Sequence, residues 1–175
     1  TTGDIPMPNL HLPHIPTGDA TLDTAFLIAL GDLAVNVRPY PSGLLAEPEP
    51  VVLAGLEYDR PWTRDAAINV WNGAGLLLPE ISRATLRAVL IEDQHGLRIG
   101  GQYWDAIIWV VGAWSYYCIT GDRAFLAQAL AASRNSLAYF EATEFAPELG
   151  LFRGPACYGD GVAAYPAVYA NAGTS

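Results

Sequence analysis

Residues 103–119 carry so many apolar side chains that they constrain the fold more than any other part of the chain. The segment, Tyr-Trp-Asp-Ala-Ile-Ile-Trp-Val-Val-Gly-Ala-Trp-Ser-Tyr-Tyr-Cys-Ile, puts apolar residues on nearly every side of a helix. A helix of this kind is usually buried on all sides. Its longest uninterrupted apolar run, residues 106–113, is much shorter than the roughly 18 residues that cross a bilayer. We therefore expect this helix to lie inside an assembly of other helices.

Four further segments repeat apolar residues at the three- and four-residue intervals of a helix. Prolines and glycines separate these segments, and Thr120-Gly-Asp122 is a turn so short that the helices it joins must be antiparallel. Residues 1–18 contain four prolines and predict an extended arm, and residues 51–53 could form a short strand. No longer segment alternates as a strand would, so the predicted fold class is all-α, built of helical hairpins. The predicted helices cover about residues 19–37, 63–77, 79–92, 103–119 and 122–143.

The predicted helices alternate in character along the chain. The first, third and fifth have one apolar stripe, whereas the fourth is apolar nearly throughout and the second is rich in apolar and small residues. This alternation predicts outer and inner helices in turn. Such an order is typical of an α/α toroid, in which an outer antiparallel ring surrounds an inner ring of parallel helices.

Composition excludes several classes of function. The net charge is −9 and the nine basic residues are all arginine, which disfavours a nucleic-acid partner because phosphate binding needs clustered positive charge. The histidines and the two cysteines, Cys118 and Cys157, have no metal-site spacing, so we expect free thiols, no metal and no cofactor. No membrane partner is expected. The first residues lack the pattern of a signal peptide, but such a peptide could already have been removed, so the localisation stays open.

Aromatic and charged residues gather where the two predicted inner helices begin. Trp62 and Asp65 open the helix over 63–77, and Trp104 and Asp105 open the next. Parallel inner helices would bring these residues to one end, where rings could stack on a sugar and charged groups could bind its hydroxyls. The alternative is structural, since Asp is a favoured helix cap and exposed ion pairs are weak. The predicted sugar-binding residues are Tyr58, Trp62, Arg64, Asp65, Tyr103, Trp104, Asp105, Arg153 and Tyr158.

A third acidic residue, Asp160, lies in a glycine-rich loop before the place where the next inner helix is expected. In sequence, Asp160 has no neighbouring cation other than Arg153. It is therefore the best candidate for a general acid, whose pKa an apolar setting should raise. Asp65 follows Arg64 and is near Arg60 in sequence, so we expect it to stay ionised. Two roles stay open: Arg153 either contacts substrate or orients Asp160, and Asp105 either binds sugar or caps its helix.

Two motifs resemble those of six-hairpin glycoside hydrolases. Trp62-Thr-Arg-Asp65 resembles the glucoamylases, in which this Arg and Asp hold the non-reducing sugar in the innermost subsite. Residues 103–109 and 120–126 resemble the amylo-α-1,6-glucosidase part of glycogen debranching enzymes and the related processing α-glucosidases. The resemblance covers about residues 19–170. It implies that residues 19–175 form the N-terminal half of an (α/α)6 toroid of twelve helices. By position Asp160 is similar to the catalytic acid of debranching enzymes, although the surrounding Tyr-Gly-Asp-Gly departs from their sequence.

The activity implied by this resemblance is exo-acting, inverting hydrolysis of α-glucosides or related oligosaccharides. Inversion needs a second carboxylate about 6.5–9.5 Å from the acid, and in this family it comes from the second half of the toroid. We therefore expect the C-terminal half of the domain as a partner and no activity from residues 1–175 alone. Three alternatives remain. One is a polysaccharide lyase, for which only His95 is near a motif, and another is a non-catalytic carbohydrate-binding toroid. A terpene cyclase is disfavoured because the chain has no aspartate-rich diphosphate motif.

Overall fold

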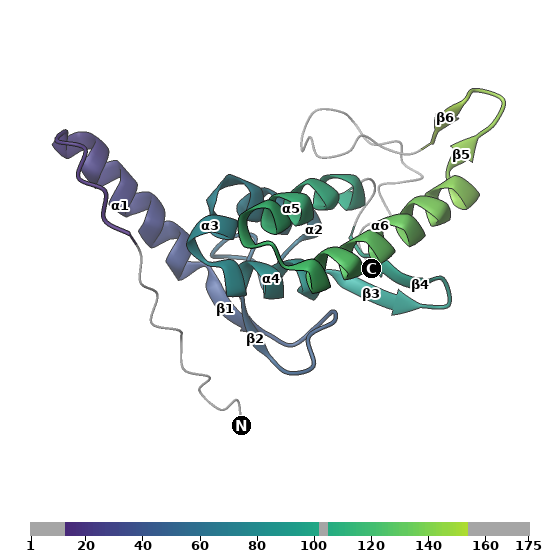
Figure 1. Ribbon diagram of the computed structural model, residues 1–175, viewed down its shortest axis with the longest axis horizontal. Helices are drawn as coiled ribbons and strands as arrows, with labels where there is room; N and C mark the ends of the chain where they lie inside the picture. The colour runs from purple at the N-terminus through teal and green to yellow at the C-terminus, as the bar shows by residue number, and fades with distance from the viewer. Residues whose placement is uncertain (1–12, 102–104, 154–175) are drawn as a thin grey trace.

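The part of the chain that the structure describes is mostly helical and contains three small antiparallel strand pairs (Figure 1). The computed structural model describes residues 13–101 and 105–153. Its helices are α1 (Ala20–Val35), α2 (Thr63–Asn69), the π-helical turn η1 (Val70–Ala74), α3 (Gly75–Leu77), α4 (Pro79–Ala88), α5 (Asp105–Thr120) and α6 (Arg123–Thr143). Its antiparallel strand pairs are β1 (Val37–Tyr40) with β2 (Glu49–Val52), β3 (Leu90–Asp93) with β4 (Gly96–Ile99), and β5 (Phe145–Ala146) with β6 (Leu151–Phe152).

Two helices begin where their capping residues predict. Asp19 accepts hydrogen bonds from the backbone N–H groups of the first turn of α1. Asp122 accepts one from Phe125 N at 2.9 Å and caps α6. Gly121, between α5 and α6, has the left-handed φ of 69° that a short interhelical turn needs. The predicted helical hairpin formed by α5 and α6 is thus confirmed. Residues 13–18 precede α1 without forming a helix or strand.

The helix predicted over 63–77 is present but interrupted. The turn η1 separates α2 from α3, and within it Gly73 has an extended backbone (φ 167°, ψ −39°). Glycine is a poor helix former, which accounts for the break in the helix at Gly73. The hydrogen bonds of a π-helical turn span one residue more than those of an α-helix, which shifts the residues after it around the helix axis.

The prediction that the chain has no strands beyond residues 51–53 was wrong. The helix predicted over 79–92 ends at Ala88, and Leu90 begins a hairpin. Its turn is held by Asp93 Oδ1, which accepts from His95 N at 2.8 Å, and Gly96 has a left-handed φ of 83°. Glycine adopts a left-handed φ without strain, which suits Gly96 to this tight turn. Strands of four residues are too short to give a clear alternating pattern.

A second hairpin replaces the loop predicted after the first helix. Val51 and Val52 belong to β2 as expected, and Val37, predicted as the last residue of a helix, begins β1. Pro39 and Pro50 face each other across the pair. Val52 N donates to the buried Thr85 Oγ1 at 2.9 Å, which fixes β2 to α4. Proline is tolerated here because the hairpin has only two strands, so each strand is an edge strand.

The two predicted inner helices run parallel. Thr63 lies against Gly101, Ala67 against Gly112, and Gly75 close to Ile119, so contacts advance in the same direction along both segments. A Cβ on Gly112 would lie 2.7 Å from Ala67 Cα, so the backbones approach closely at this point. On the same buried face of α5, the fully buried Trp109 donates from Nε1 to Leu86 O of α4 at 3.1 Å.

Burial is less complete than the sequence predicts. One face of α5 is buried, but apolar side chains on its other side are exposed. The expectation that this helix is covered on all sides was therefore wrong for the described residues. In α1, which extends away from the other helices (Figure 1), only Leu30 is buried within the part of the chain described, where one apolar stripe was expected. The exposed apolar residues are Leu22, Leu27, Ile28 and Val35 of α1, and Ile107, Val110, Val111, Trp114 and Ile119 of α5.

The Gly112 contact can be tested against a glycine in a similar helical position. Gly112→Ala should destabilise the protein by roughly 1–3 kcal/mol, because the new methyl group would overlap the backbone of Ala67. Gly31→Ala, in the interior of α1 with no atom within 4 Å of its Cβ position, should be neutral or stabilising by up to about 1 kcal/mol. Denaturant unfolding of the two variants measures both effects, and equal changes would contradict the packing described.

Candidate functional site

The starts of α2 and α5 lie at the same end of the helices, as the sequence predicts. Thr63, the first residue of α2, donates from Oγ1 to Gly100 O at 2.9 Å. Gly100 and Gly101 lead towards Asp105, where the described part of α5 begins. This contact brings Trp62-Thr-Arg-Asp65 close to the segment that precedes Asp105. We call this end of the paired helices the mouth; it comprises residues 62–65, Gly100, Gly101 and Asp105.

Trp62 is the aromatic residue of the mouth that the structure describes. Its side chain is partly buried, and the Arg60 guanidinium carbon lies 5.7 Å from the ring centroid, within cation–π distance. The indole Nε1 is buried and has no acceptor among the described residues. Buried indole N–H groups usually have a hydrogen-bond partner. The Trp62 Nε1–H is therefore an unsatisfied donor at the mouth.

Arg60 was expected to lie near Asp65 and favour its ionised form. Arg60 forms a hydrogen-bonded ion pair with Asp59, from Nε to Oδ1 at 2.9 Å. That hydrogen bond and the adjacent opposite charge lower the pKa of the Asp59 carboxyl and raise the pKa of Arg60. The pairing of Arg60 therefore gives no support to its expected effect on Asp65.

The charged residues of the mouth lie in the first turns of their helices. Arg64 and Asp65 are partly exposed in α2, whereas Asp105 is only 6% exposed in α5. All three side chains have interaction partners. A helix N-terminus favours nearby negative charge, so both carboxylates are in positions that stabilise their helices as well as positions that could bind hydroxyls.

The other predicted site residues are placed less favourably or fall outside the described residues. Tyr58 is 54% exposed in a turn closed by its N–H and Gly55 O. Arg153 follows the β5–β6 hairpin and pairs with Glu148 at 2.7 Å. The pair is exposed to solvent. Arg153 thus already has a carboxylate partner within its own hairpin. Tyr103, Trp104, Tyr158 and Asp160 lie outside the described residues, as does Cys157, while Cys118 is a free, exposed thiol.

Two glycines at the mouth were missed by sequence reasoning. Gly101 has a φ of 111°, and a Cβ there would overlap the Thr63 side chain. Gly100 N donates to Val89 O at 2.9 Å, and a Cβ on Gly100 would lie 2.9 Å from that same oxygen. The sequence did contain a signal, the pair Gly100-Gly101 shortly before Tyr103 and Trp104. Glycine is favoured where backbones approach closely.

The β3–β4 hairpin holds these glycines in place from the side of α6. Ile99 N donates to Ser136 Oγ, and Asn135 Nδ2 donates to Leu97 O, both at 2.9 Å. Arg98 adds a cation–π contact with Tyr139, with 4.1 Å between the guanidinium carbon and the ring centroid. The mouth is therefore supported by a hairpin that is itself attached to α6.

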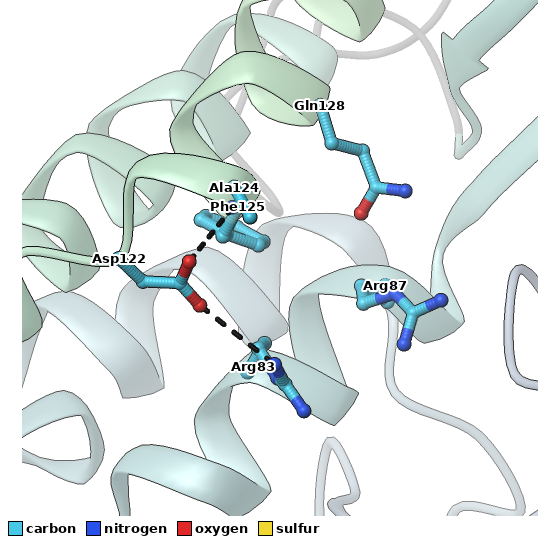
Figure 2. Close-up of a pocket in the computed structure, with 6 residues that line it drawn as sticks. All are labelled: Arg83, Arg87, Asp122, Ala124, Phe125 and Gln128. Carbon is cyan, nitrogen blue, oxygen red and sulfur yellow. Dashed lines mark hydrogen bonds and ion pairs between the residues drawn. The ribbon is translucent and has the colours of Figure 1, made fainter.

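A small hollow lies at the opposite end of α5, where α6 begins (Figure 2). Asp122 is the cap of α6 and its Oδ2 is 3.7 Å from Arg83 Nη1, while Arg87 Nη2 donates to Leu44 O at 3.0 Å. The 16 residues of α5, about 24 Å of helix, lie between its start at the mouth and the α5–α6 turn beside this hollow. The polar groups here join α4 to the α5–α6 turn, and we assign them a structural role. The hollow encloses about 190 Å³ and is lined by Arg83, Arg87, Asp122, Ala124, Phe125 and Gln128.

The structural role of this hollow can be measured directly. Asp122→Ala should cost about 1 kcal/mol of unfolding free energy, because it removes the cap of α6. Arg83→Ala should cost at most about 0.5 kcal/mol, since its ion pair with Asp122 is long and about half exposed on the arginine side. Denaturant unfolding of both variants would reveal the difference, and a larger loss for Arg83→Ala would contradict this assignment.

Within the described residues, no group of three histidine, cysteine or acidic side chains is arranged to hold a metal ion. None of the helices described there has the length and apolar character needed to cross a membrane. No protein-family model, curated protein or solved structure matches the chain. The functional interpretation therefore rests on the residues of the mouth.

Proposed function

We propose that this chain is the N-terminal part of the catalytic domain of an exo-acting glycoside hydrolase, with the α/α toroid fold. The observation that carries the proposal is the parallel pairing of α2 and α5, with Thr63, the first residue of α2, hydrogen-bonded to Gly100 in the segment that precedes α5. That pairing puts an indole, an arginine and two carboxylates at one end of neighbouring helices. Rings and charged hydrogen-bonding groups together are what recognition of a pyranose requires.

The exposed apolar face of α5 supports the toroid. Ile107 is followed by Val110 and Val111 three and four residues later, and both precede Trp114 by four and three residues, so the four lie on one helix face, and all are exposed. A continuous apolar surface of this kind usually marks a surface that another segment covers. In a closed ring, neighbouring inner helices would cover it. The partner proposed for this face is accordingly the C-terminal half of the same catalytic domain.

The proposed reaction is inverting hydrolysis of α-glucosides or related oligosaccharides. Trp62, Arg64, Asp65 and Asp105 would hold the innermost sugar, and Asp160 would protonate the leaving-group oxygen. The base that activates water would lie outside these 175 residues, since inversion needs a second carboxylate opposite the acid.

The placement of His95 favours hydrolysis over the lyase alternative. A lyase would need this residue as an acid or base at the substrate, but its ring packs edge-on against Tyr139 at the β3–β4 turn, with centroids 5.2 Å apart. Figure 1 shows that turn at the tip of the β3–β4 hairpin, whereas Gly100 of the mouth follows the opposite end of β4.

The roles of two carboxylates can be separated in a polypeptide that carries the complete domain. Asp160→Asn should lower kcat for maltose hydrolysis by several orders of magnitude with little change in sugar affinity, because only proton donation is lost. Asp65→Ala should weaken sugar binding as well. Steady-state kinetics with direct binding measurements test this, and small, equal losses for both variants would show that the residues are only helix caps.

Residues 1–175 alone should bind an α-glucoside without hydrolysing it, because the proposed base is absent from them. Release of glucose from maltooligosaccharides, measured against the Asp160→Asn variant of the same chain as background, provides the test. Turnover above that background would refute the location proposed for the base.

A further inference from the structure

Thr63 is a buried polar residue inside the motif proposed to bind sugar. Its side chain is 2% exposed and lies between Trp62 and Arg64 in sequence, yet it points to the neighbouring segment and not to solvent. The hydroxyl donates to Gly100 O at 2.9 Å. A threonine at this position is therefore part of the contact between α2 and the segment that leads into α5.

The Gly100–Gly101 segment is held on two sides. Gly100 N donates to Val89 O at the start of the β3–β4 hairpin, and Gly100 O accepts from Thr63. Gly101 packs so closely on Thr63 that no side chain would fit, and its φ of 111° is one that other residues rarely adopt. The segment consequently has little freedom to shift relative to α2.

We infer that Thr63 is a positioning residue, which sets where Asp105 lies relative to Trp62 and Asp65 through its contact with Gly100 and Gly101. The inference rests on the proposed function, because it concerns the fit of the innermost sugar. Thr63 itself need not touch the sugar. A shift of about 1 Å in the start of α5 would move the Asp105 carboxylate out of hydrogen-bonding range of a hydroxyl held by α2.

Thr85 provides a matched control for this role. It is also fully buried, and its hydroxyl also joins two segments, donating to Ile81 O at 2.7 Å and accepting from Val52 N at 2.9 Å. It joins α4 to β2, elements that contribute none of the mouth residues. Thr→Val at either position removes a buried hydroxyl with almost no change of shape, so both variants lose stability for the same reason.

The experiment measures maltose affinity by isothermal titration calorimetry and unfolding temperature for the wild-type chain and its variants. Thr63→Val should weaken maltose binding by about tenfold, whereas Thr63→Ser, which keeps the hydroxyl, should stay within about twofold of wild type. Thr85→Val should lower the unfolding temperature by a similar amount to Thr63→Val and leave the affinity unchanged.

A second pair of variants decides the question if Thr63→Val does not fold. Gly101→Ala should weaken maltose binding, while Gly43→Ala, at another left-handed glycine that packs on the Ala88 backbone, should affect stability alone.

Two results would overturn the inference in different ways. Equal affinity losses in Thr63→Val and Thr85→Val, with maltose still bound by wild type, would show that Thr63 is only structural. Absence of maltose binding by the wild-type chain would instead remove the proposed function, and the positioning role with it.

Discussion

The close approach of α5 to α2 at Gly112 is the contact on which the rest of the structure depends. With no side chain on Gly112, the α5 backbone lies against Ala67, and Gly75 allows a second approach near Ile119. Two parallel helices in such close contact must begin at the same end. On the same buried face of α5, Trp109 packs against Phe125 of α6 and hydrogen-bonds to Leu86 O of α4, so this face contacts α2, α4 and α6. The mouth exists because this packing fixes both helix starts together.

Local patterns predicted the helices well and the hairpins poorly, for a physical reason. A helix is specified by neighbours three and four residues apart, and the caps at Asp19 and Asp122 are equally local. The β3–β4 hairpin depends instead on α6, through Ser136 and Asn135, which lie 37 and 38 residues from their backbone partners Ile99 and Leu97. Strand preference is set largely by such tertiary contacts, so four-residue strands leave little trace in the sequence.

The apolar pattern predicted which side chains favour burial, but not what covers them. In α5 one face packs on α2, α4 and α6, while Ile107, Val111 and Trp114 are exposed. In α1 a single leucine is buried among the described residues, and a 16-residue helix has marginal stability on its own in water. Both helices thus have the composition of covered helices and expose apolar faces. This mismatch, more than any single residue, supports a larger helical assembly around them.

The site could be predicted from sequence only as far as its local parts. Trp62, Asp65 and Asp105 were placed correctly at helix starts, because such starts have a local signature. The link between those starts was not predictable, since Thr63 and Gly100 are 37 residues apart and nothing in Trp62-Thr-Arg-Asp65 marks its threonine as buried. That link in turn depends on α6, which holds β4, which leads into Gly100. The β3–β4 hairpin, whose first strand was predicted as the end of a helix, therefore supports the geometry of the mouth, and changes at Ser136 or Asn135 of α6 should reach the site through it.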